Sequence, residues 1–287
     1  MSTFDWTTKS VLVTGGAGSF GRKFVEMLLK KHRPARLAIF SRDEWKHSQM
    51  RADLDHPSLR WFIGDVRDRD RLRRAMENIE VVIHAAALKR IEVGQYNPLE
   101  VKKTNIDGTA NVVEAATDAG VARAVLVSSD KAYQPISPYG TSKAFAESLF
   151  LAANNTHGKY GPKFAVVRYG NVWGSTGSVV PLWKSILVTS DTVPVTDPEC
   201  TRFFMRMEEA VALVYLTAAT MEGGELKIPT LPAYRLGDLA EAMGARMNVL
   251  GLPTWEKRHE SMGEGNRSDT ARRMSVDELR EILRCAS

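Results

Sequence analysis

Cysteine is scarce in this sequence of 287 residues, with only Cys200 and Cys285 present. Two cysteines are too few for a disulfide framework, and they lack the spacing of metal ligands. The sequence also lacks an apolar run close to the roughly 18 residues needed to cross a bilayer, and its first ten residues contain no apolar signal core. We therefore expect a cytoplasmic protein with no metal site and no membrane partner.

A concentration of one charge sign is also absent. The 39 basic and 34 acidic residues give a net charge of +5, and the basic residues are spread over several predicted helices. In the arginine-rich stretch from Arg67 to Arg74, Asp68 and Asp70 are interleaved, which is typical of a solvated helix face. We find no nucleic-acid-binding module in the sequence, so we expect no nucleic-acid partner, and the mild positive charge suits an anionic small molecule.

Short β-branched apolar runs alternate with longer helical patterns between residues 10 and 170. Strands are predicted at Val11–Thr14, Leu37–Phe40, Arg60–Ile63, Val81–His84, Ala124–Ser128 and Phe164–Tyr169. Helices are predicted at Phe20–Lys31, Asp43–Leu54, Pro98–Ala119 and Tyr139–Asn154. This succession of βαβ units predicts an α/β fold, with a Rossmann-type doubly wound parallel sheet.

The chain changes in texture after residue 170, where loops containing Gly, Ser and Pro become common. Further helices are predicted at Val179–Thr189, Arg206–Met221, Tyr234–Met247 and Ser275–Leu283. We expect residues 1–170 to form the Rossmann domain, with a returning segment at about 203–230. Residues 171–202 and 231–287 would form a small C-terminal lobe over the carboxyl edge of the sheet, where doubly wound folds bind their ligands.

A glycine-rich turn follows the first predicted strand. Gly15, Gly18 and Gly21 have a GxxGxxG spacing, with Ser19 and Phe20 between the last two. Glycine at such a turn lets backbone N–H groups approach a pyrophosphate and lets the helix pack closely on the sheet. A sharp turn without a ligand would need the same glycines, but the strand before it and the helix after it favour a dinucleotide site.

Three polar residues, Ser41, Arg42 and Asp43, follow the second predicted strand. An NAD enzyme usually carries an acidic residue at this point to bind the adenosine ribose. Ser41 and Arg42 can instead hold the 2′-phosphate of NADP, so we expect NADP as the cofactor. In the alternative, Asp43 binds the ribose and Arg42 is surface charge.

Residues after the third and fourth predicted strands complete the expected cofactor site. Asp65 and Val66 suit contact with adenine, and Ala85, Ala86 and Ala87 leave room for the cofactor backbone. Small residues at the end of a strand equally mark ordinary tight packing.

Reactive side chains follow the fifth predicted strand. Tyr139 and Lys143 lie one helical turn apart and share a face. A neighbouring ammonium favours the phenolate, so Tyr139 can accept a hydroxyl proton while a hydride leaves the same carbon. Ser129, Asp130 and Lys131 precede this pair and would add an acid and a base; the alternative is an exposed turn with an Asp–Lys ion pair.

These motifs resemble the extended short-chain dehydrogenase/reductase superfamily and, within it, the inverting UDP-N-acetylglucosamine 4,6-dehydratases of polysaccharide biosynthesis. The resemblance extends from about residue 11 to residue 260. It is carried by Thr14–Gly21, Ser41–Glu44, Phe62–Asp68, Tyr96–Glu100, Lys103–Asn105, Ser129–Ala132, Tyr139–Lys143, Val167–Asn171, Gly177–Pro181 and Thr201–Phe203. Glucose-type dehydratases generally have Asp-Glu where this sequence, like the N-acetylglucosamine family, has Asp130 and Lys131.

The resemblance implies a lyase that uses NADP to oxidise C4 of UDP-N-acetylglucosamine, removes water across C5 and C6, and returns the hydride to C6 with inversion at C5. Tyr139, supported by Lys143 and Ser129, would take the proton of the C4 hydroxyl. Lys131 would remove the C5 proton, which requires a lowered pKa. Asp130 would protonate the departing C6 hydroxyl, which requires a raised pKa.

The resemblance also implies a homo-oligomer, a contact of Lys103 with the cofactor, and a set of substrate contacts. The implied substrate-binding residues are Lys89, Asn171, Ser178, Val179, Arg202 and Glu260. The sequence departs from the family at Thr176, where arginine is usual, and at Trp173, where a smaller apolar residue is usual.

Two other functions stay open. A nucleotide-sugar 4- or 5-epimerase would use the same NADP site without loss of water. A non-catalytic NADP-sensing protein would keep the fold, but such proteins commonly lose the Tyr/Lys pair that this sequence retains.

Overall fold

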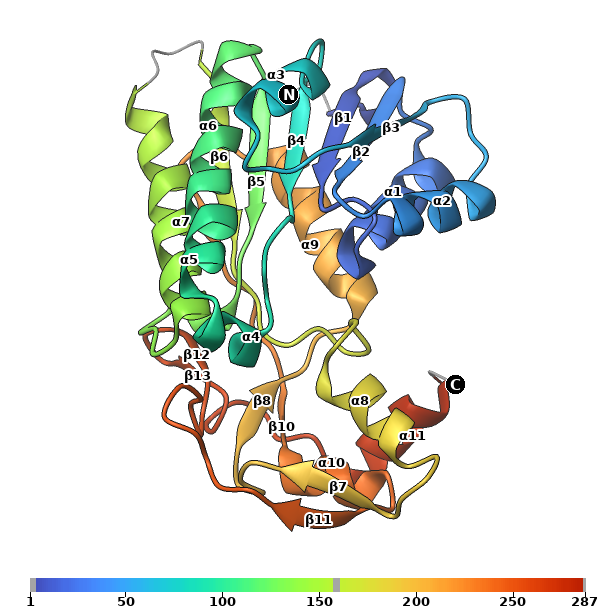
Figure 1. The fold of residues 1–287 in the computed structure, drawn as a ribbon, viewed down its shortest axis with the longest axis vertical. Coiled ribbons are helices and arrows are strands. Elements are labelled where there is room, and N and C mark those ends of the chain that lie inside the picture. The colour runs from blue at the N-terminus through green and yellow to red at the C-terminus, as the bar shows by residue number, and fades with distance from the viewer. Residues whose placement is uncertain (1–3, 157–160, 286–287) are drawn as a thin grey trace.

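A parallel sheet of seven strands is the main feature of the computed structural model, which describes residues 4–156 and 161–285 (Figure 1). The strand order is β3 (Leu59–Ile63), β2 (Arg36–Ser41), β1 (Ser10–Thr14), β4 (Val81–His84), β5 (Arg123–Val127), β6 (Lys163–Val167) and β9 (Leu226–Lys227). Every neighbouring pair is parallel. The predicted Rossmann-type α/β fold is confirmed.

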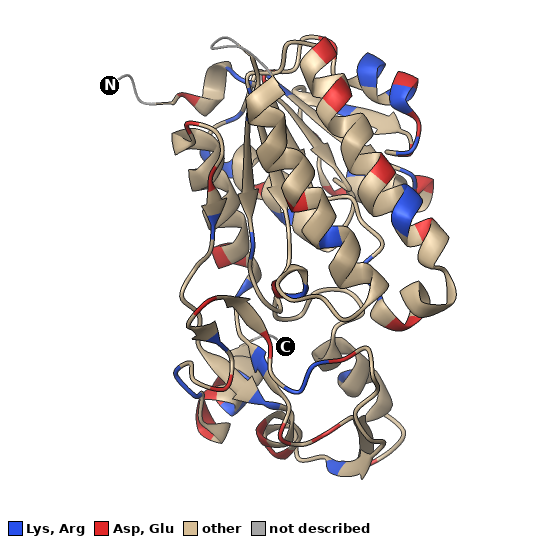
Figure 2. Cartoon of the chain, turned by 90° about the vertical axis from the view of Figure 1, so that its left-hand side faces the viewer, with Lys and Arg blue, Asp and Glu red and all other residues tan. Residues whose placement is uncertain are grey.

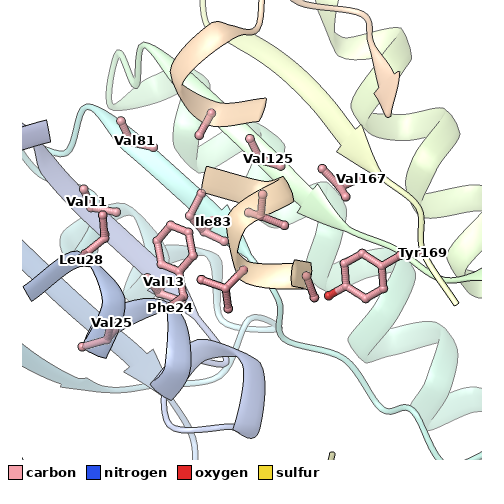
Figure 3. Close-up of a cluster of buried hydrophobic side chains, with 14 of the residues drawn as sticks. Val11, Val13, Phe24, Val25, Leu28, Val81, Ile83, Val125, Val167 and Tyr169 are labelled. Carbon is pink, nitrogen blue, oxygen red and sulfur yellow. The ribbon is translucent and has the colours of Figure 1, made fainter. Parts of the chain in front are cut away.

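Both faces of the sheet are buried, and the alternation of side chains along β1 shows how. Val11 and Val13 point to the face covered by α1 (Ser19–Lys31) and α9 (Met207–Thr220), as Figure 3 shows for this cluster. Leu12 points to the opposite face, which is covered by α6 (Gly108–Asp118) and α7 (Pro138–Thr156). Because both faces are covered, the strand reads as a continuous apolar run in the sequence.

Two short helices on the sheet start at aspartate caps. Asp43 accepts a hydrogen bond from the backbone N–H of Lys46 at the start of α2 (Glu44–Asp53). Asp68 accepts one from the N–H of Arg71 at the start of α3 (Arg69–Ala75). A side-chain oxygen at this position satisfies an N–H that has no partner inside the helix.

The helix expected over Pro98–Ala119 is confirmed, but it is not regular along its length. It begins with α5 (Pro98–Val101), continues through a π-helical segment, η2 (Lys102–Asp107), and ends with α6, while a separate short helix, α4 (Ile91–Tyr96), precedes it. Asn105 in η2 is buried, and its side chain bonds both the N–H and the carbonyl of Leu88, at 2.8 and 3.0 Å. This side chain is therefore turned to the loop after β4 within the widened turn.

A separate small core holds the C-terminal lobe together. Its buried side chains include Trp183, Phe204, Tyr234, Leu239 and Leu279. They come from α8 (Val179–Ile186), β10 (Ala233–Arg235), α10 (Leu236–Ala242), α11 (Val276–Cys285) and the segment after β8 (Thr201–Phe203). Figure 1 shows these elements gathered beyond the carboxyl ends of the sheet strands.

The helix expected over Tyr234–Met247 is wrong in its second half. Helix α10 ends at Ala242, and Gly244 has a φ of 69°, the left-handed conformation that commonly terminates a helix. The chain then forms β11 (Arg246–Val249), which pairs in parallel with β7 (Thr192–Val195). Met247 therefore belongs to a strand.

Acidic and basic residues are intermixed over the helices around the sheet and over the lobe (Figure 2). Within residues 4–156 and 161–285, no helix combines the length and apolar character needed to cross a membrane.

Near the start of the chain, a short helical turn, η1 (Trp6–Thr8), places Trp6 under α1 and α9, stacked on Tyr215 with ring centroids 5.1 Å apart.

Replacing Trp6 tests this contact. Trp6 is 1% exposed, so we expect Trp6→Ala to lower the free energy of unfolding by about 3–5 kcal/mol. Chemical denaturation followed by circular dichroism measures the change. Trp45→Ala is the matched control, because Trp45 is 68% exposed, and it should change stability by less than about 0.5 kcal/mol. Equal effects of the two substitutions would contradict the buried position of Trp6.

Candidate active site

The turn between β1 and α1 has the shape of a dinucleotide site. Gly15 has a φ of 67°, and a Cβ there would lie 2.9 Å from the backbone of Ala86 after β4. A Cβ at Gly21 would lie 2.5 Å from the carbonyl oxygen of Gly15. Gly18 precedes α1 without a side-chain cap, so the N–H groups of the first helical turn are available to an anion.

Ser19 and Phe20 begin α1 and have different surroundings. Phe20 is partly buried and stacks on Phe24 with ring centroids 6.0 Å apart. The Ser19 hydroxyl lies 2.7 Å from the hydroxyl of Thr176 and accepts a hydrogen bond from the Thr176 N–H at 3.2 Å. The position where the family usually has arginine therefore lies at the start of the helix that would hold the pyrophosphate.

The residues after β2 are already partly engaged with one another. Asp43 caps α2 and its carboxylate pairs with Lys46 at 2.9 Å. Arg42 is half exposed and lies 3.5 Å from Asp65, which follows β3. Ser41 donates to or accepts from His47 at 2.6 Å. The structure thus leaves the guanidinium of Arg42 open to solvent and commits Asp43 to the helix start.

The remaining residues of the expected cofactor site are spread between the sheet edge and a helix surface. Val66 is buried against Gly108 of α6, where a Cβ would lie 2.6 Å from the Val66 side chain. Ala85, Ala86 and Ala87 follow β4 and are partly exposed. Their strand is the neighbour of β1 at the point where the strand order reverses, which is where doubly wound folds bind ligands. Lys103 lies exposed on η2 and pairs with Glu100 at 2.9 Å.

The proposed reactive residues come together at the carboxyl end of β5. Asp130 and Lys131 form a helical turn, η3 (Asp130–Ala132), that packs on the first turn of α7. Gly140 makes this contact possible, because a Cβ there would lie 2.5 Å from the carbonyl oxygen of Lys131. The glycine after Tyr139 thus brings that tyrosine against the Asp–Lys turn. The structure places Ser129, Asp130, Lys131 and Tyr139 in one cluster, and Lys143 lies one turn after Tyr139 on α7.

Lys131 is held between two buried carboxylates. Its Nζ lies 3.1 Å from Oδ1 of Asp130 and 3.2 Å from Oε1 of Glu260, which comes from the C-terminal lobe. The Ser129 hydroxyl donates to the same Asp130 oxygen at 2.9 Å. The side chains of Asp130 and Glu260 are 1% and 2% exposed, so the alternative of an exposed turn is wrong.

The pKa of each member of this cluster is shifted. Burial and the negative charge of Glu260 raise the pKa of Asp130, although Lys131 opposes them, which confirms the shift expected for an acid. The lowered pKa expected for Lys131 is wrong. Burial alone would lower the pKa of Lys131, but the carboxylates of Asp130 and Glu260 outweigh burial and raise it. Lys131 therefore carries a proton in this arrangement.

Tyr139 and Lys143 are both buried, and burial shifts the pKa of each. Burial raises the pKa of Tyr139, with the Lys131 ammonium and the Ser129 hydroxyl opposing it. Lys143 donates to the carbonyl of Val127 at 2.7 Å. Burial lowers the pKa of Lys143 to about 8, with the Glu147 carboxylate opposing it. The buried state of both groups was not visible in their spacing.

Several expected substrate residues have polar atoms in need of a partner. Within the described residues, Asn171 Oδ1, Ser178 Oγ, Asp130 Oδ2 and Glu260 Oε2 are buried and form no hydrogen bond. Buried polar atoms are nearly always bonded, so a molecule with hydroxyl or amide groups would satisfy them. Ser178 precedes α8, which starts at Val179, whereas Lys89 is an exposed residue of the loop after β4.

Arg202 is engaged within the lobe. Its guanidinium donates to the backbone carbonyls of Thr201 and Arg258, at 2.8 and 3.0 Å, and pairs with Glu256. Arg202 is 5% exposed. Its charge acts on the reactive cluster from a distance, since it lowers the pKa of Glu260, together with Lys131, against the effect of burial.

A buried ion pair beside the cluster, between Glu147 and Arg168, was not predicted from the sequence. Glu147 lies one turn after Lys143 on α7 and pairs with Arg168, the residue that follows β6. The Ser128 hydroxyl donates to Glu147 at 2.6 Å. The signal was present in the sequence, because Glu147 continues the spacing of Tyr139 and Lys143 along a helix face that is otherwise apolar.

Comparison with known proteins shows which family the chain belongs to. A family model described as polysaccharide biosynthesis protein matches residues 11–279. The chain belongs to this family. The chain is similar to the UDP-N-acetylglucosamine 4,6-dehydratase (inverting) of Campylobacter jejuni, with 42% identity over 257 residues that cover 88% of this chain and 77% of the relative. These matches confirm the resemblance identified from the motifs.

Other similar proteins include enzymes with a different printed activity. The UDP-glucose 4-epimerase of Rickettsia bellii is 36% identical over 263 residues, which cover 88% of this chain and 77% of the relative. Among solved structures, Pen from Bacillus thuringiensis has a TM-score of 0.94 and 32% identity, with 98% of both chains covered. The dTDP-glucose 4,6-dehydratase DesIV of Streptomyces venezuelae has a TM-score of 0.82 and 23% identity, with 96% of both chains covered, which shows the shared fold.

The buried His84 at the end of β4 gives a prediction on acid stability. Burial lowers the pKa of His84 to about 3, and the Lys143 charge adds to the effect. Because an unfolded histidine titrates near 6.5, the unfolded chain binds one more proton than the folded chain between these values. Above about pH 6.5, His84 therefore has no effect on how the free energy of unfolding changes with pH. Below that pH, its protonation in the unfolded chain lowers the free energy of unfolding by up to about 1.4 kcal/mol per pH unit.

We expect His84→Gln to remove this contribution. The free energy of unfolding of the variant should fall less steeply than that of the parent protein between about pH 6.5 and pH 4. Urea denaturation at a series of pH values measures both slopes. Parallel slopes would show that His84 is protonated in the folded protein.

Proposed function

We propose that this protein is an NADP-dependent nucleotide-sugar 4,6-dehydratase, a lyase whose substrate is UDP-N-acetylglucosamine and whose product is inverted at C5. The observation that carries the proposal is the Asp130–Lys131 pair, buried and in contact beside Tyr139. Oxidation at C4 needs only the tyrosine and the cofactor, whereas elimination of water also needs a base and an acid. The 42% identity to a relative of this printed activity supports the same substrate.

The residues at the sheet edge fit NADP. The uncapped start of α1 and the close-packed glycines Gly15 and Gly21 suit a pyrophosphate. Arg42 has an open guanidinium for a 2′-phosphate, whereas the Asp43 carboxylate is engaged by the start of α2 and by Lys46. When bound, NADP would supply the hydride acceptor that oxidises the sugar at C4 and later reduces it at C6.

Each proton transfer of the proposed reaction is assigned to one side chain. Tyr139 would accept the proton of the C4 hydroxyl on its phenol oxygen, which requires the phenolate and therefore a nearby positive charge to lower its pKa. Lys131 Nζ would accept the C5 proton of the 4-keto sugar. Asp130 would donate a proton to the C6 hydroxyl, which leaves as water.

The 3.1 Å contact between Lys131 and Asp130 supplies both working forms in one step. If the proton of the Lys131 ammonium moves to Oδ1 of Asp130, the lysine becomes a neutral base and the aspartate a neutral acid. Proton abstraction at C5 and protonation of the C6 hydroxyl then restore the ammonium and the carboxylate. The raised pKa of Lys131 is thus compatible with a role as a base, because the proton it must lose is the proton that Asp130 must gain.

The second candidate is a nucleotide-sugar 4-epimerase, which the 36% identity to a UDP-glucose 4-epimerase of Rickettsia bellii favours. A 4-epimerase has no use for an acid and a base beside C5 and C6.

We also propose a homo-oligomer, which is supported by exposed apolar side chains on neighbouring elements, namely Tyr96, Leu99, Ile136 and Phe145.

The proposed activity is tested by incubating the protein with UDP-N-acetylglucosamine and NADP⁺ and weighing the nucleotide sugar by mass spectrometry. We expect the loss of one water without net formation of NADPH, because the hydride is returned. Lys131→Ala should still fold and bind NADP, with reduced stability because Asp130 and Glu260 lose the cation between them, but it should form no dehydrated product. An unchanged mass with a new sugar configuration by NMR would establish the epimerase, and a fully active Lys131→Ala would remove Lys131 from the mechanism.

Cofactor choice is tested at Arg42. We expect Arg42→Ala to raise the Kd for NADP by about tenfold to a hundredfold and to leave the Kd for NAD nearly unchanged, because a charged hydrogen bond to phosphate contributes about 1.5–3 kcal/mol. Titration calorimetry measures both constants. Lys46→Ala, which removes a neighbouring positive charge on α2, is the control and should keep the preference. Equal loss of affinity for both dinucleotides would assign Arg42 to another role.

A further inference from the structure

The reactive turn is fastened to the C-terminal lobe at several points. Glu260 of the lobe contacts Lys131 at 3.2 Å. The Nζ of Lys257 donates to the carbonyl of Tyr133, the residue after the turn, at 2.6 Å. These contacts join residues 131–133 to residues 257–260, which lie far apart in the sequence. The position of the lobe segment therefore decides where the carboxylate of Glu260 lies.

Arg168 joins this lobe segment to the sheet domain. Its Nε donates to Oε1 of Glu147 at 2.9 Å, and a second nitrogen bonds the other carboxylate oxygen. A third nitrogen donates to the carbonyl of Met262, in β12 (Ser261–Gly263), at 2.8 Å. The guanidinium also lies 5.8 Å from the ring centroid of Tyr133. One side chain thus contacts α7, the lobe and the end of the reactive turn.

The Glu147–Arg168 pair is costly to bury, since both side chains are at most 10% exposed. A buried ion pair is often no more stabilising than two apolar side chains of similar size. Its directional bonds, by contrast, fix positions: an arginine fork holds a carboxylate in one plane with two of its five N–H groups and leaves the others for further partners. Here one of these other N–H groups is aimed at a backbone carbonyl of the lobe.

Met262 lies two residues from Glu260, a span of about 7 Å in an extended chain. On its other side, Glu260 is fixed by Ser268, whose hydroxyl accepts from the Glu260 N–H at 2.8 Å and whose N–H donates to the Glu260 carbonyl at 2.8 Å. The backbone of Glu260 is therefore held by Ser268 and, through Met262, by Arg168. Loss of the second attachment would let the carboxylate move away from Lys131.

We propose that Arg168 is a positioning residue for proton transfer: by bonding the carbonyl of Met262, it holds the carboxylate of Glu260 against Lys131 and so fixes the amine that removes the C5 proton. Lysine has a long and flexible side chain, and its Nζ is aimed by two carboxylates, of which only Asp130 belongs to the same turn. The proposal rests on the proposed dehydratase function. Oxidation at C4, which uses Tyr139, does not depend on this link.

The first test measures the contact itself and needs no enzymatic activity. Acetic anhydride acetylates unprotonated and accessible amines, and peptide mass spectrometry gives the rate at Lys131. We expect Arg168→Lys to raise this rate by about tenfold, equivalent to one pKa unit, because a lysine can stay paired with Glu147 but cannot also reach Met262. Glu260→Gln should raise the rate similarly.

The matched control is Arg235→Met, which removes another forked arginine of the lobe, paired with Asp238 and Glu199, and should leave the rate at Lys131 unchanged. Should Arg168→Lys fold poorly, the double variant Glu147→Gln/Arg168→Met replaces the pair without leaving a buried charge. An unchanged rate at Lys131 in a folded Arg168 variant would overturn the proposal.

The second test separates the steps of the reaction. In single turnovers with UDP-N-acetylglucosamine, Arg168→Lys should form reduced nicotinamide as fast as the parent protein, while the release of water and the exchange of the C5 proton with deuterium oxide become about tenfold slower, as for a change of about 1.4 kcal/mol in the barrier. A purely structural defect would slow all three together, and that result would overturn the proposal. If the parent protein dehydrates no nucleotide sugar, the dehydratase function fails, while the acetylation rates still decide whether Arg168 positions Lys131.

Discussion

The ammonium of Lys131, placed between Asp130 and Glu260, is the interaction on which the site depends. Each carboxylate is almost fully removed from water, and a buried charge without a partner is strongly destabilising. Lys131 is the only cation that contacts both of them within the described residues. Since Glu260 belongs to the lobe and Asp130 to the sheet domain, neither part can shift without breaking a contact that the other requires.

The sheet determines which residues can meet at this point. Parallel strands end at one edge, so the turns after β1, β4, β5 and β6 lie at the same edge of the sheet. Two close backbone approaches then set the detail: Gly15 lies against the loop after β4, and Gly140 lies against the carbonyl of Lys131. A side chain at Gly15 would push the turn after β1 away from the loop after β4, and a side chain at Gly140 would push α7 away from the reactive turn.

Sequence patterns that reflect local constraints predicted the structure well. Buried parallel strands are continuous apolar runs, and the Tyr139–Lys143 spacing is a property of one helix turn. What the patterns could not contain is the meeting of distant segments. The raised pKa of Lys131 depends on Glu260, which only the folded lobe brings near, and strand β11 depends on pairing with β7. The pairing of Glu147 with Arg168 was missed for the same reason, although the spacing of Glu147 after Lys143 on α7 is visible in the sequence.

The late position of helix α9 in the chain determines when one face of the sheet is covered during synthesis. The helix packs beside α1 and covers one face of β5 and β6, but it follows the first part of the lobe in the chain. During translation, which proceeds from the N-terminus, those strands leave the ribosome well before the helix that shields them. The nascent chain therefore carries an apolar sheet face that stays uncovered until residues 207–220 emerge, and this interval is when the protein is most exposed to aggregation and to chaperones.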